Sequence, residues 1–419
     1  MKKEFNNFGS PLRLNHVVFI LFVALISFVP FNANAQFLKK LLGTVGEVLS
    51  DNSSSSGGTS RNFSPLNSKG QVKIPAVVFS NPYSNSDGYE RSEGSIGTEW
   101  KRKGIPNRYS LNHVFEKSYA GIPYCFVITD TNKGYVTLAS IGGFKADYEI
   151  PERIKWEKTG RQYIVEAIGA NAFQSRSINS IDFPPTISQI GYEAFLGSKM
   201  ETFKVPSSVT LISARAFADC KKLKSVYIPA SVKEIGYGVF ANCTSLENII
   251  VDENNKYYKS VNGVLYNKSM TELIQYPCGK KDRTYTAPSS LISVNRQAFY
   301  KCWYLEDVVL PYGVKYISVE AFNNARLHNL YLPSSICEIG AGGLATDNWY
   351  DSYSNPVKTN VIIESNQPIK ATQSALKYYN TSYLGELKLY VKKGSRKLYL
   401  EEEPWSDVEE VIEAEFIKK

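Results

Sequence analysis

Self-similarity at a period of 22 to 23 residues constrains the fold of this chain more than any other feature of its sequence. A motif of the form Ile-Gly-x-x-Ala-Phe recurs, with the aromatic residue five positions after the aliphatic one. Successive copies are 22, 22, 23, 59, 23 and 22 residues apart. A repeat of this length predicts one coil of a solenoid, because a single unit cannot bury its apolar side without a neighbour. The seven copies end at Phe173, Phe195, Phe217, Phe240, Phe299, Phe322 and Leu344.

A second repeated segment, with the pattern Leu-x-x-Ile-x-Ile-Pro, predicts a short β-strand in each coil. In one copy Tyr227 lies between Val226 and Ile228, so the aliphatic side chains face the core and the tyrosine faces water. Proline ends five of the six segments, since it has no amide hydrogen to donate to a β-ladder, and Asp252 ends the sixth. The chain is therefore predicted to be a mainly β solenoid. The segments span residues 178–184, 200–206, 223–229, 246–252, 305–311 and 327–333.

Residues 216–229 carry the longest form of the motif, Ala-Phe-Ala-Asp-Cys-Lys-Lys-Leu-Lys-Ser-Val-Tyr-Ile-Pro. This stretch resembles the signature of BspA-like bacterial leucine-rich repeats, Ala-Phe-x-x-Cys-x-x-Leu-x-x-Ile-x-Ile-Pro, at every fixed position except Val226. The resemblance covers about residues 124–404. It implies a leucine-rich-repeat solenoid in a bacterial surface or secreted protein.

The 59-residue spacing between Phe240 and Phe299 indicates an insert in one coil. The insert is predicted to be a β-hairpin added to that coil, with two strands around Asn267-Lys268-Ser269 and a tight turn at Asn262-Gly263 before it. Both ends of an open solenoid also need caps that cover apolar rows and free strand edges. We expect the repeats to span residues 123–345, the insert about 253–287 and the C-terminal cap 346–419.

The N-terminal part of the chain carries features of export. Residues 1–35 are predicted to be a signal peptide, because basic residues precede an apolar run that ends near an Ala33-Asn34-Ala35 cleavage motif. The run is shorter than the roughly 20 residues of a membrane-spanning helix. Residues 36–71 combine an amphipathic segment with a Ser/Gly-rich linker, and residues 72–122 are predicted to be irregular. We expect an exported protein, extracellular or at the cell surface or outer envelope, without an integral membrane span after signal cleavage.

Three of the six cysteines share one position of the repeat. Cys220, Cys243 and Cys302 each lie three residues after the motif phenylalanine. Neighbouring coils are about 4.8 Å apart, within the range of Cα separations found in disulfides. A Cys220–Cys243 bridge is one interpretation. We favour buried free thiols, because other coils place Arg, Ser or Ala in the same slot.

Composition and motifs argue against several classes of function. The net charge of +8 is spread along the chain and forms no basic stripe of the kind that binds nucleic acid. The sequence contains no nucleophile elbow, zinc-binding helix, P-loop or dinucleotide-binding fingerprint. We therefore expect no catalytic residues, no metal site, no cofactor and no nucleic-acid partner.

The outward row of the predicted strands is the remaining candidate for function. It presents four ligand-binding candidates, Tyr227, Ile250, Val309 and Tyr331, at one position of different coils. Regularly spaced aromatic and aliphatic side chains suit an extended ligand, although strand propensity alone also favours these residue types. We hypothesise a non-catalytic recognition or adhesion protein that binds a host or cell-surface protein or glycan. The alternatives are a structural or scaffold protein of the cell envelope and, less favoured, a hydrolase.

Overall fold

The computed structural model describes residues 71–74, 114–143, 145–346, 358–377 and 387–418. The predicted signal peptide and residues 36–70 and 75–113 lie outside this set, so the predictions made for them stay predictions. All described residues belong to one compact unit, Ser60–Lys419. Within the described ranges, no helix has the length and apolar character needed to cross a membrane.

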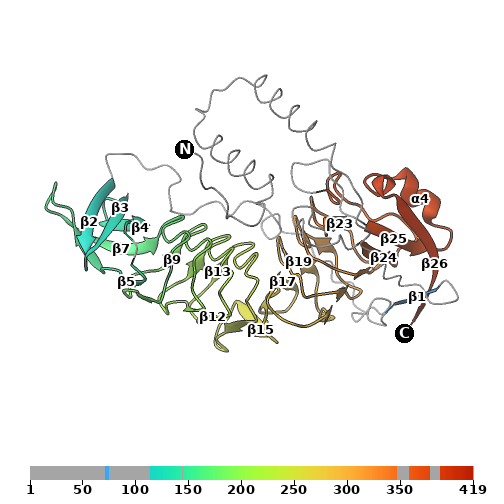
Figure 1. Ribbon diagram of the computed structural model, residues 1–419, viewed down its shortest axis with the longest axis horizontal. Coiled ribbons are helices and arrows are strands. Elements are labelled where there is room, and N and C mark those ends of the chain that lie inside the picture. Colours follow the sequence, from blue (N-terminus) through green and yellow to red (C-terminus); the bar gives the residue numbers. More distant parts are fainter. Residues whose placement is uncertain (1–70, 75–113, 144, 347–357, 378–386, 419) are drawn as a thin grey trace, which may run out of the picture. The chain divides into compact units, whose positions relative to one another are not determined.

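The predicted strands before the prolines are present and stack in parallel, which confirms the solenoid (Figure 1). We call them the proline stack. Their inward side chains are in register from coil to coil, as Phe203 pairs with Val226 and Val226 with Ile249. The strands are β8 (Ser180–Asp182), β10 (Thr202–Lys204), β12 (Ser225–Ile228), β14 (Asn248–Val251), β20 (Asp307–Val309), β22 (Asn329–Leu332) and β18 (Thr284–Thr286), which precedes Pro288 but was not among the predicted segments.

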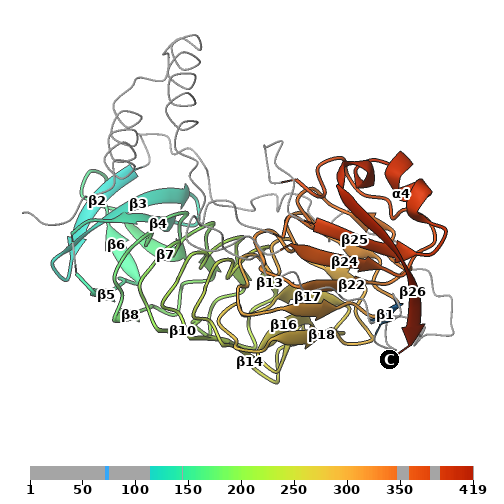
Figure 2. The same cartoon turned by 45° about the vertical axis from the view of Figure 1, so that its right-hand side comes forward.

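A second set of short strands coincides with the Ile-Gly motif and forms another parallel stack, the isoleucine stack, on the other side of the coils (Figures 1 and 2). Apart from β17, which contains the second strand predicted for the insert, these strands have only two residues and show no period in the sequence. They are β9 (Gln189–Ile190), β11 (Leu211–Ile212), β13 (Glu234–Ile235), β17 (Glu272–Gln275), β19 (Ser293–Val294), β21 (Tyr316–Ile317) and β23 (Glu338–Ile339).

The motif phenylalanines form a ladder of stacked rings between the two stacks. Phe217 lies between Phe195 and Phe240, with ring centroids 5.0 Å and 5.6 Å apart. All three rings are buried. The insert interrupts the ladder, and a second ladder begins where Tyr276 stacks on Phe299 at 5.3 Å. The apolar core accordingly consists of two large clusters, one on each side of the insert.

Two turns in each coil use the left-handed backbone region, which is uncommon outside glycine. Because the same two positions adopt it in successive coils, the residues form two rows along the solenoid. One row lies two residues before the motif phenylalanine and the other lies two residues after it. The rows comprise Asn171, Glu193, Arg215, Gly238, Gln297, Glu320 and Gly342, and Ser175, Gly197, Asp219, Asn242, Lys301 and Asn324.

The insert contains the predicted pair of antiparallel strands. It is part of the core of the solenoid and is not only attached to the surface of one coil. Strands β15 (Tyr258–Val261) and β16 (Val264–Asn267) are antiparallel, and Asn262 and Gly263 form the turn with φ of +51° and +81°. β16 and β17 (Glu272–Gln275) are the antiparallel pair predicted around Asn267-Lys268-Ser269, and β17 continues the isoleucine stack. Leu265 belongs to the first core cluster and Tyr266 to the second, so the insert joins the two halves of the core.

The two ends of the described unit are covered by strands outside the repeat. At the N-terminal end a mixed sheet precedes the isoleucine stack, and β7, which is parallel to β4 and to β9, joins the two. It contains β2 (Val114–Tyr119), β3 (Ile122–Asp130), β4 (Tyr135–Ile141), β6 (Arg153–Lys155) and β7 (Gln162–Ile168), while β5 (Asp147–Glu149) pairs with β8.

At the C-terminal end the proline stack continues beyond the last motif. β24 (Thr359–Ile363), β25 (Leu387–Lys392) and β26 (Glu410–Lys418) extend it in parallel, and helix α4 (Arg396–Glu401) and the turn η2 (Trp405–Asp407) follow β25. β1 (Gln71–Ile74) pairs with β26 at the edge. Thus β1 and β2 lie in residues 72–122 or at their border, which the sequence analysis described as irregular.

Burial of Glu272 in β17 predicts that stability depends on pH. Burial raises the pKa of this carboxyl to about 7, so the folded protein holds a proton that the unfolded chain releases at lower pH. The resulting stability is present below the unfolded pKa of about 4.3 and is lost as pH rises through about 7. Urea unfolding of the parent should show this loss, whereas Glu272→Gln should flatten it. An unchanged pH dependence in the variant would assign the effect to another group.

Candidate functional site

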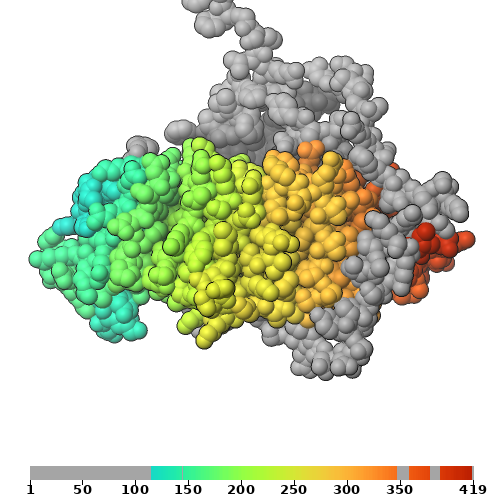
Figure 3. Space-filling view, turned by 90° about the horizontal axis from the view of Figure 1, so that it is seen from below, coloured from blue at the N-terminus to red at the C-terminus, as the bar shows by residue number. Residues whose placement is uncertain are grey.

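The outward row is open to solvent over the coils before the insert. Lys204, Tyr227 and Ile250 are register partners on β10, β12 and β14. Ile250 is 49% exposed, Lys204 is exposed and Tyr227 is half-buried. We call these three residues the Tyr227 row. Figure 3 shows the coils of this part of the chain as successive bands, in the order of the sequence.

Neighbouring charged groups hold Tyr227 in place at the centre of this row. Its hydroxyl donates a hydrogen bond of 2.6 Å to Oδ2 of Asp252, the residue that directly follows β14 in the next coil. This bond raises the pKa of Tyr227 and lowers the pKa of Asp252. The Nζ atom of Lys204 lies 5.7 Å from the centroid of the tyrosine ring, within the range of a cation–π contact. The ring is therefore oriented before any partner arrives.

The outward row does not stay open beyond the insert, and the prediction for Val309 as a water-facing residue is wrong. Val309 is only 2% exposed and packs in a separate apolar cluster with Ile362 and Tyr390. Tyr331 packs against the same cluster, and burial raises its pKa to about 12. Large apolar side chains on β22, β24 and β25 occupy the same row, so they cover one another instead of facing water.

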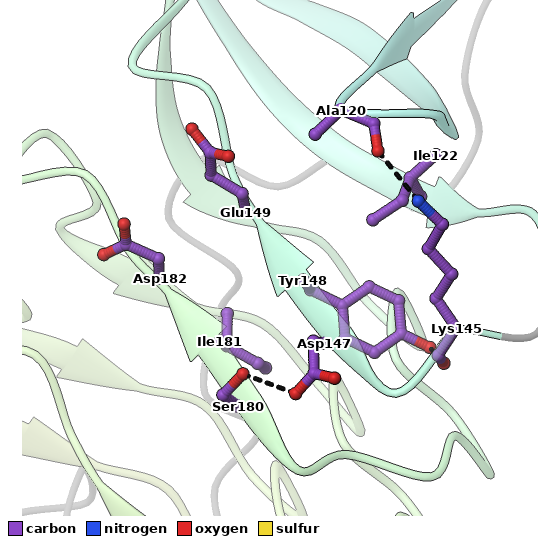
Figure 4. A pocket seen from close by; sticks show the side chains of 9 residues that line it. All are labelled: Ala120, Ile122, Lys145, Asp147, Tyr148, Glu149, Ser180, Ile181 and Asp182. Carbon is purple, nitrogen blue, oxygen red and sulfur yellow. Dashed lines mark hydrogen bonds between the residues drawn. The ribbon is translucent and has the colours of Figure 1, made fainter.

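A shallow hollow lies at the N-terminal end of the outward row (Figure 4). It has a volume of about 370 Å³ and is formed by β5 and β8 with residues near the start of β3. Its carboxylates come from Asp147, Glu149 and Asp182. Asp147 accepts a hydrogen bond of 2.7 Å from Ser180, and Glu149 accepts one of 2.9 Å from Tyr119. In the described part of the chain, no three His, Cys, Asp or Glu side chains come together as metal ligands.

The cysteines differ in part from the expectation. Cys220 and Cys243 are buried free thiols, as favoured from the sequence. Their Sγ atoms donate to the carbonyls of Phe195 and Phe217 in the preceding coils, at 3.1 Å and 3.0 Å. The structure contains a disulfide elsewhere, between Cys278 and Cys302, which the sequence analysis missed. Burial is the main cause that raises the pKa of Cys243, so this thiol is a poor nucleophile.

The comparisons with known proteins agree with this repeat architecture. The profile of the BspA type leucine rich repeat region matches residues 166–281 and 280–360 with six copies. The repeat region belongs to the BspA-type leucine-rich repeat family. The BspA-type match begins in β7 and ends in β24, so it covers both the coils before the insert and those after it.

Solved structures of other leucine-rich repeat proteins are similar to this chain. The pneumococcal vaccine antigen PcpA is 21% identical, with a TM-score of 0.44, over 73% of this chain and 98% of that chain. A leucine-rich repeat protein from Eubacterium ventriosum is 23% identical, with a TM-score of 0.43, over 65% of this chain and 77% of that chain. One from Bacteroides ovatus is 21% identical, with a TM-score of 0.40, over 70% and 75% of the two chains. None of the curated proteins matches the chain.

Proposed function

We propose that this protein is an exported, non-catalytic recognition protein that binds a partner protein through the Tyr227 row. The observation that carries the proposal is the open arrangement of a cation, an oriented aromatic ring and a 49% exposed isoleucine on three adjacent strands. Exposed apolar side chains of this kind supply most of the binding free energy in protein interfaces. The isoleucine favours a protein over a glycan, because its contribution requires an apolar surface on the partner.

Two further observations support export. Disulfides persist in oxidising compartments, and the bond between Cys278 and Cys302 fits a protein that leaves the cytoplasm. The predicted signal peptide and the surface or secreted location implied by BspA-type repeats agree with this. Val309 and Tyr331 are not part of the proposed site, because they pack against the apolar cluster of the C-terminal strands.

The experiment compares the parent with Tyr227→Ser/Ile250→Ser on arrays of extracellular and cell-surface proteins and of glycans. Each residue is expected to contribute about 1–2 kcal/mol, so the double variant should bind its protein partner at least about tenfold more weakly. Its melting temperature should fall by no more than about 5 °C, because Ile250 is exposed and the half-buried Tyr227 loses one surface hydrogen bond, that to Asp252.

A matched control replaces an exposed tyrosine and an exposed aliphatic residue elsewhere, as Tyr304→Ser/Leu398→Ser. These side chains are 46% and 37% exposed and lie outside the Tyr227 row. The control should bind as the parent does. If the Tyr227→Ser/Ile250→Ser variant keeps full affinity for every partner of the parent, recognition does not use this row.

A further inference from the structure

The insert opens the proline stack on one side of the molecule. In the isoleucine stack, β15 and β16 precede β17 in its sheet, while β13 is the last strand of the preceding sheet. The two sheets meet where the backbone N–H of Ile235 in β13 donates to the hydroxyl of Tyr258 in β15 at 2.8 Å. In the proline stack, no strand lies between β14 and β18, the strands of the same two coils, among the described residues. Since two extra strands add about 10 Å to one side, β14 and β18 are separated by more than a normal strand spacing.

The hairpin covers only one of the two strand edges that face this gap. The backbone N–H of Ile249 in β14 donates to the carbonyl of Gly263 at the hairpin turn, at 3.1 Å. The hydroxyl of Ser260 donates to the carbonyl of Ile249. The insert therefore satisfies both backbone groups of Ile249 at the edge of β14.

Among the described residues, the edge of β18 has no such cover. Within those residues β18 pairs only with β20, and on that side the N–H of Asp307 donates to the carbonyl of Arg283, and the N–H of Ala287 to that of Val309. Backbone groups alternate in direction along a parallel strand, so those of Thr284 and Thr286 face the gap. Both threonines are exposed. A row of unpaired backbone donors and acceptors is a template for another strand.

A hollow of about 300 Å³ lies beside this edge, between β18 and the hairpin. Its wall includes the aliphatic side chains of Val261, Val264 and Met270. The hydroxyls of Tyr266 and Tyr285 hydrogen-bond with each other, so neither is left free of a partner. The size is at the lower end of the range for ligand pockets, about 300–1,000 Å³, and it fits one apolar side chain.

We propose that the β18 edge binds an extended peptide segment of a partner protein as an added strand, with one aliphatic side chain of the peptide in the hollow. Main-chain hydrogen bonds to Thr284 and Thr286 supply affinity, and the hollow supplies selectivity, as in other cases of strand addition. At the end of the hollow Lys280 and Asp282 form an ion pair of 3.0 Å, which leaves no net charge there. The site therefore selects a neutral side chain. It is separate from the Tyr227 row and does not rest on the function proposed for that row.

The test begins with selection of binders from a displayed library of random peptides on the intact protein. Thr286→Pro removes the backbone donor that faces the gap but leaves the bonds to β20, and Thr286→Val is the matched control that keeps the backbone intact. The selected peptide should bind Thr286→Pro at least about tenfold more weakly and should bind Thr286→Val as it binds the parent. Thr284→Pro is a second variant with the same expected loss.

Two readouts need no variant of the protein. Hydrogen exchange of the amides in β18 should slow when the peptide is bound. N-methylation at alternate positions of the peptide should abolish binding for one set of positions and spare the other, because only one set faces β18. Equal binding to the parent and both proline variants overturns the proposal. So does a glycan array in which sugars, and no peptides, lose binding on Thr286→Pro.

Discussion

Phe217→Ala should cost about 3–5 kcal/mol of the free energy of unfolding, the range for emptying a buried phenylalanine site. The ring is fully buried and stacks on Phe195 at 5.0 Å and on Phe240 at 5.6 Å. Phe203 approaches it from the proline stack, with a centroid distance of 4.8 Å. Because backbone hydrogen bonds fix the spacing of the coils, the neighbouring rings cannot close the cavity.

Urea unfolding monitored by circular dichroism measures this loss, and the melting temperature should fall by at least about 6 °C. Tyr304→Ala is the control for removal of an aromatic ring, since Tyr304 is 46% exposed and its loss should cost less than about 0.5 kcal/mol. A Phe217→Ala variant that melts within one or two degrees of the parent would mean that the phenylalanine ladder is not the core of the coils.

Most strands of the proline stack could be predicted because three signals coincide in one segment, whereas β14 lacks the terminal proline and β18, with Asp282 in place of the leucine, was not predicted. In 223–229 these are Leu223, the alternation around Tyr227 and the terminal Pro229. The strands of the isoleucine stack have no comparable signal, since two residues such as Leu211–Ile212 are too short to show a period. Their existence follows from the stacking of coils, which only the folded chain reveals.

The outward row could be predicted only as far as the repeat itself extends. Tyr227 and Ile250 lie in coils whose outward neighbours are all within the recognised repeats. Val309 is different, because its row continues to Ile362 and Tyr390 on strands in residues 346–419. Those strands lack the repeat motif, so their alignment with Val309 could not be predicted from the sequence. The apolar cluster that they form buries Val309, so the outward row is closed to solvent in this part of the molecule.

Sequence patterns also could not predict which distant parts of the chain pair with each other. β1 pairs with β26, and nothing in the composition of Gln71–Ile74 points to Glu410–Lys418 as its partner. The disulfide is similar, because Cys278 lies in the one coil where Tyr-Pro-Cys replaces the usual Phe-x-x-Cys spacing. In this coil the aromatic residue and the cysteine are two residues apart instead of three. For this reason the sequence did not indicate that Tyr276 takes the place of the motif phenylalanine and stacks on Phe299.

Removal of the Cys278–Cys302 disulfide should cost about 3 kcal/mol. The bond closes a loop with a sequence separation of 24 residues, and cross-linking a loop of this length restricts the unfolded chain by about that amount. The loop spans β18, so the bond also fixes the coil that follows the insert. Cys278→Ala/Cys302→Ala is the suitable variant, because Ala325 occupies the same slot in the next coil and is fully buried there.

Urea unfolding with and without a reductant measures the effect. The reductant should lower the stability of the parent to about that of the double variant, and it should leave the double variant unchanged. Peptide mapping of the non-reduced parent should find a single cross-linked pair, Cys278 with Cys302, and free thiols at Cys220 and Cys243. A bridge between Cys220 and Cys243 would contradict this pairing. It would also break the hydrogen bonds from these thiols to the carbonyls of Phe195 and Phe217. The first phenylalanine ladder would then have to shift, because the two carbonyls belong to Phe195 and Phe217, whose rings are part of that ladder.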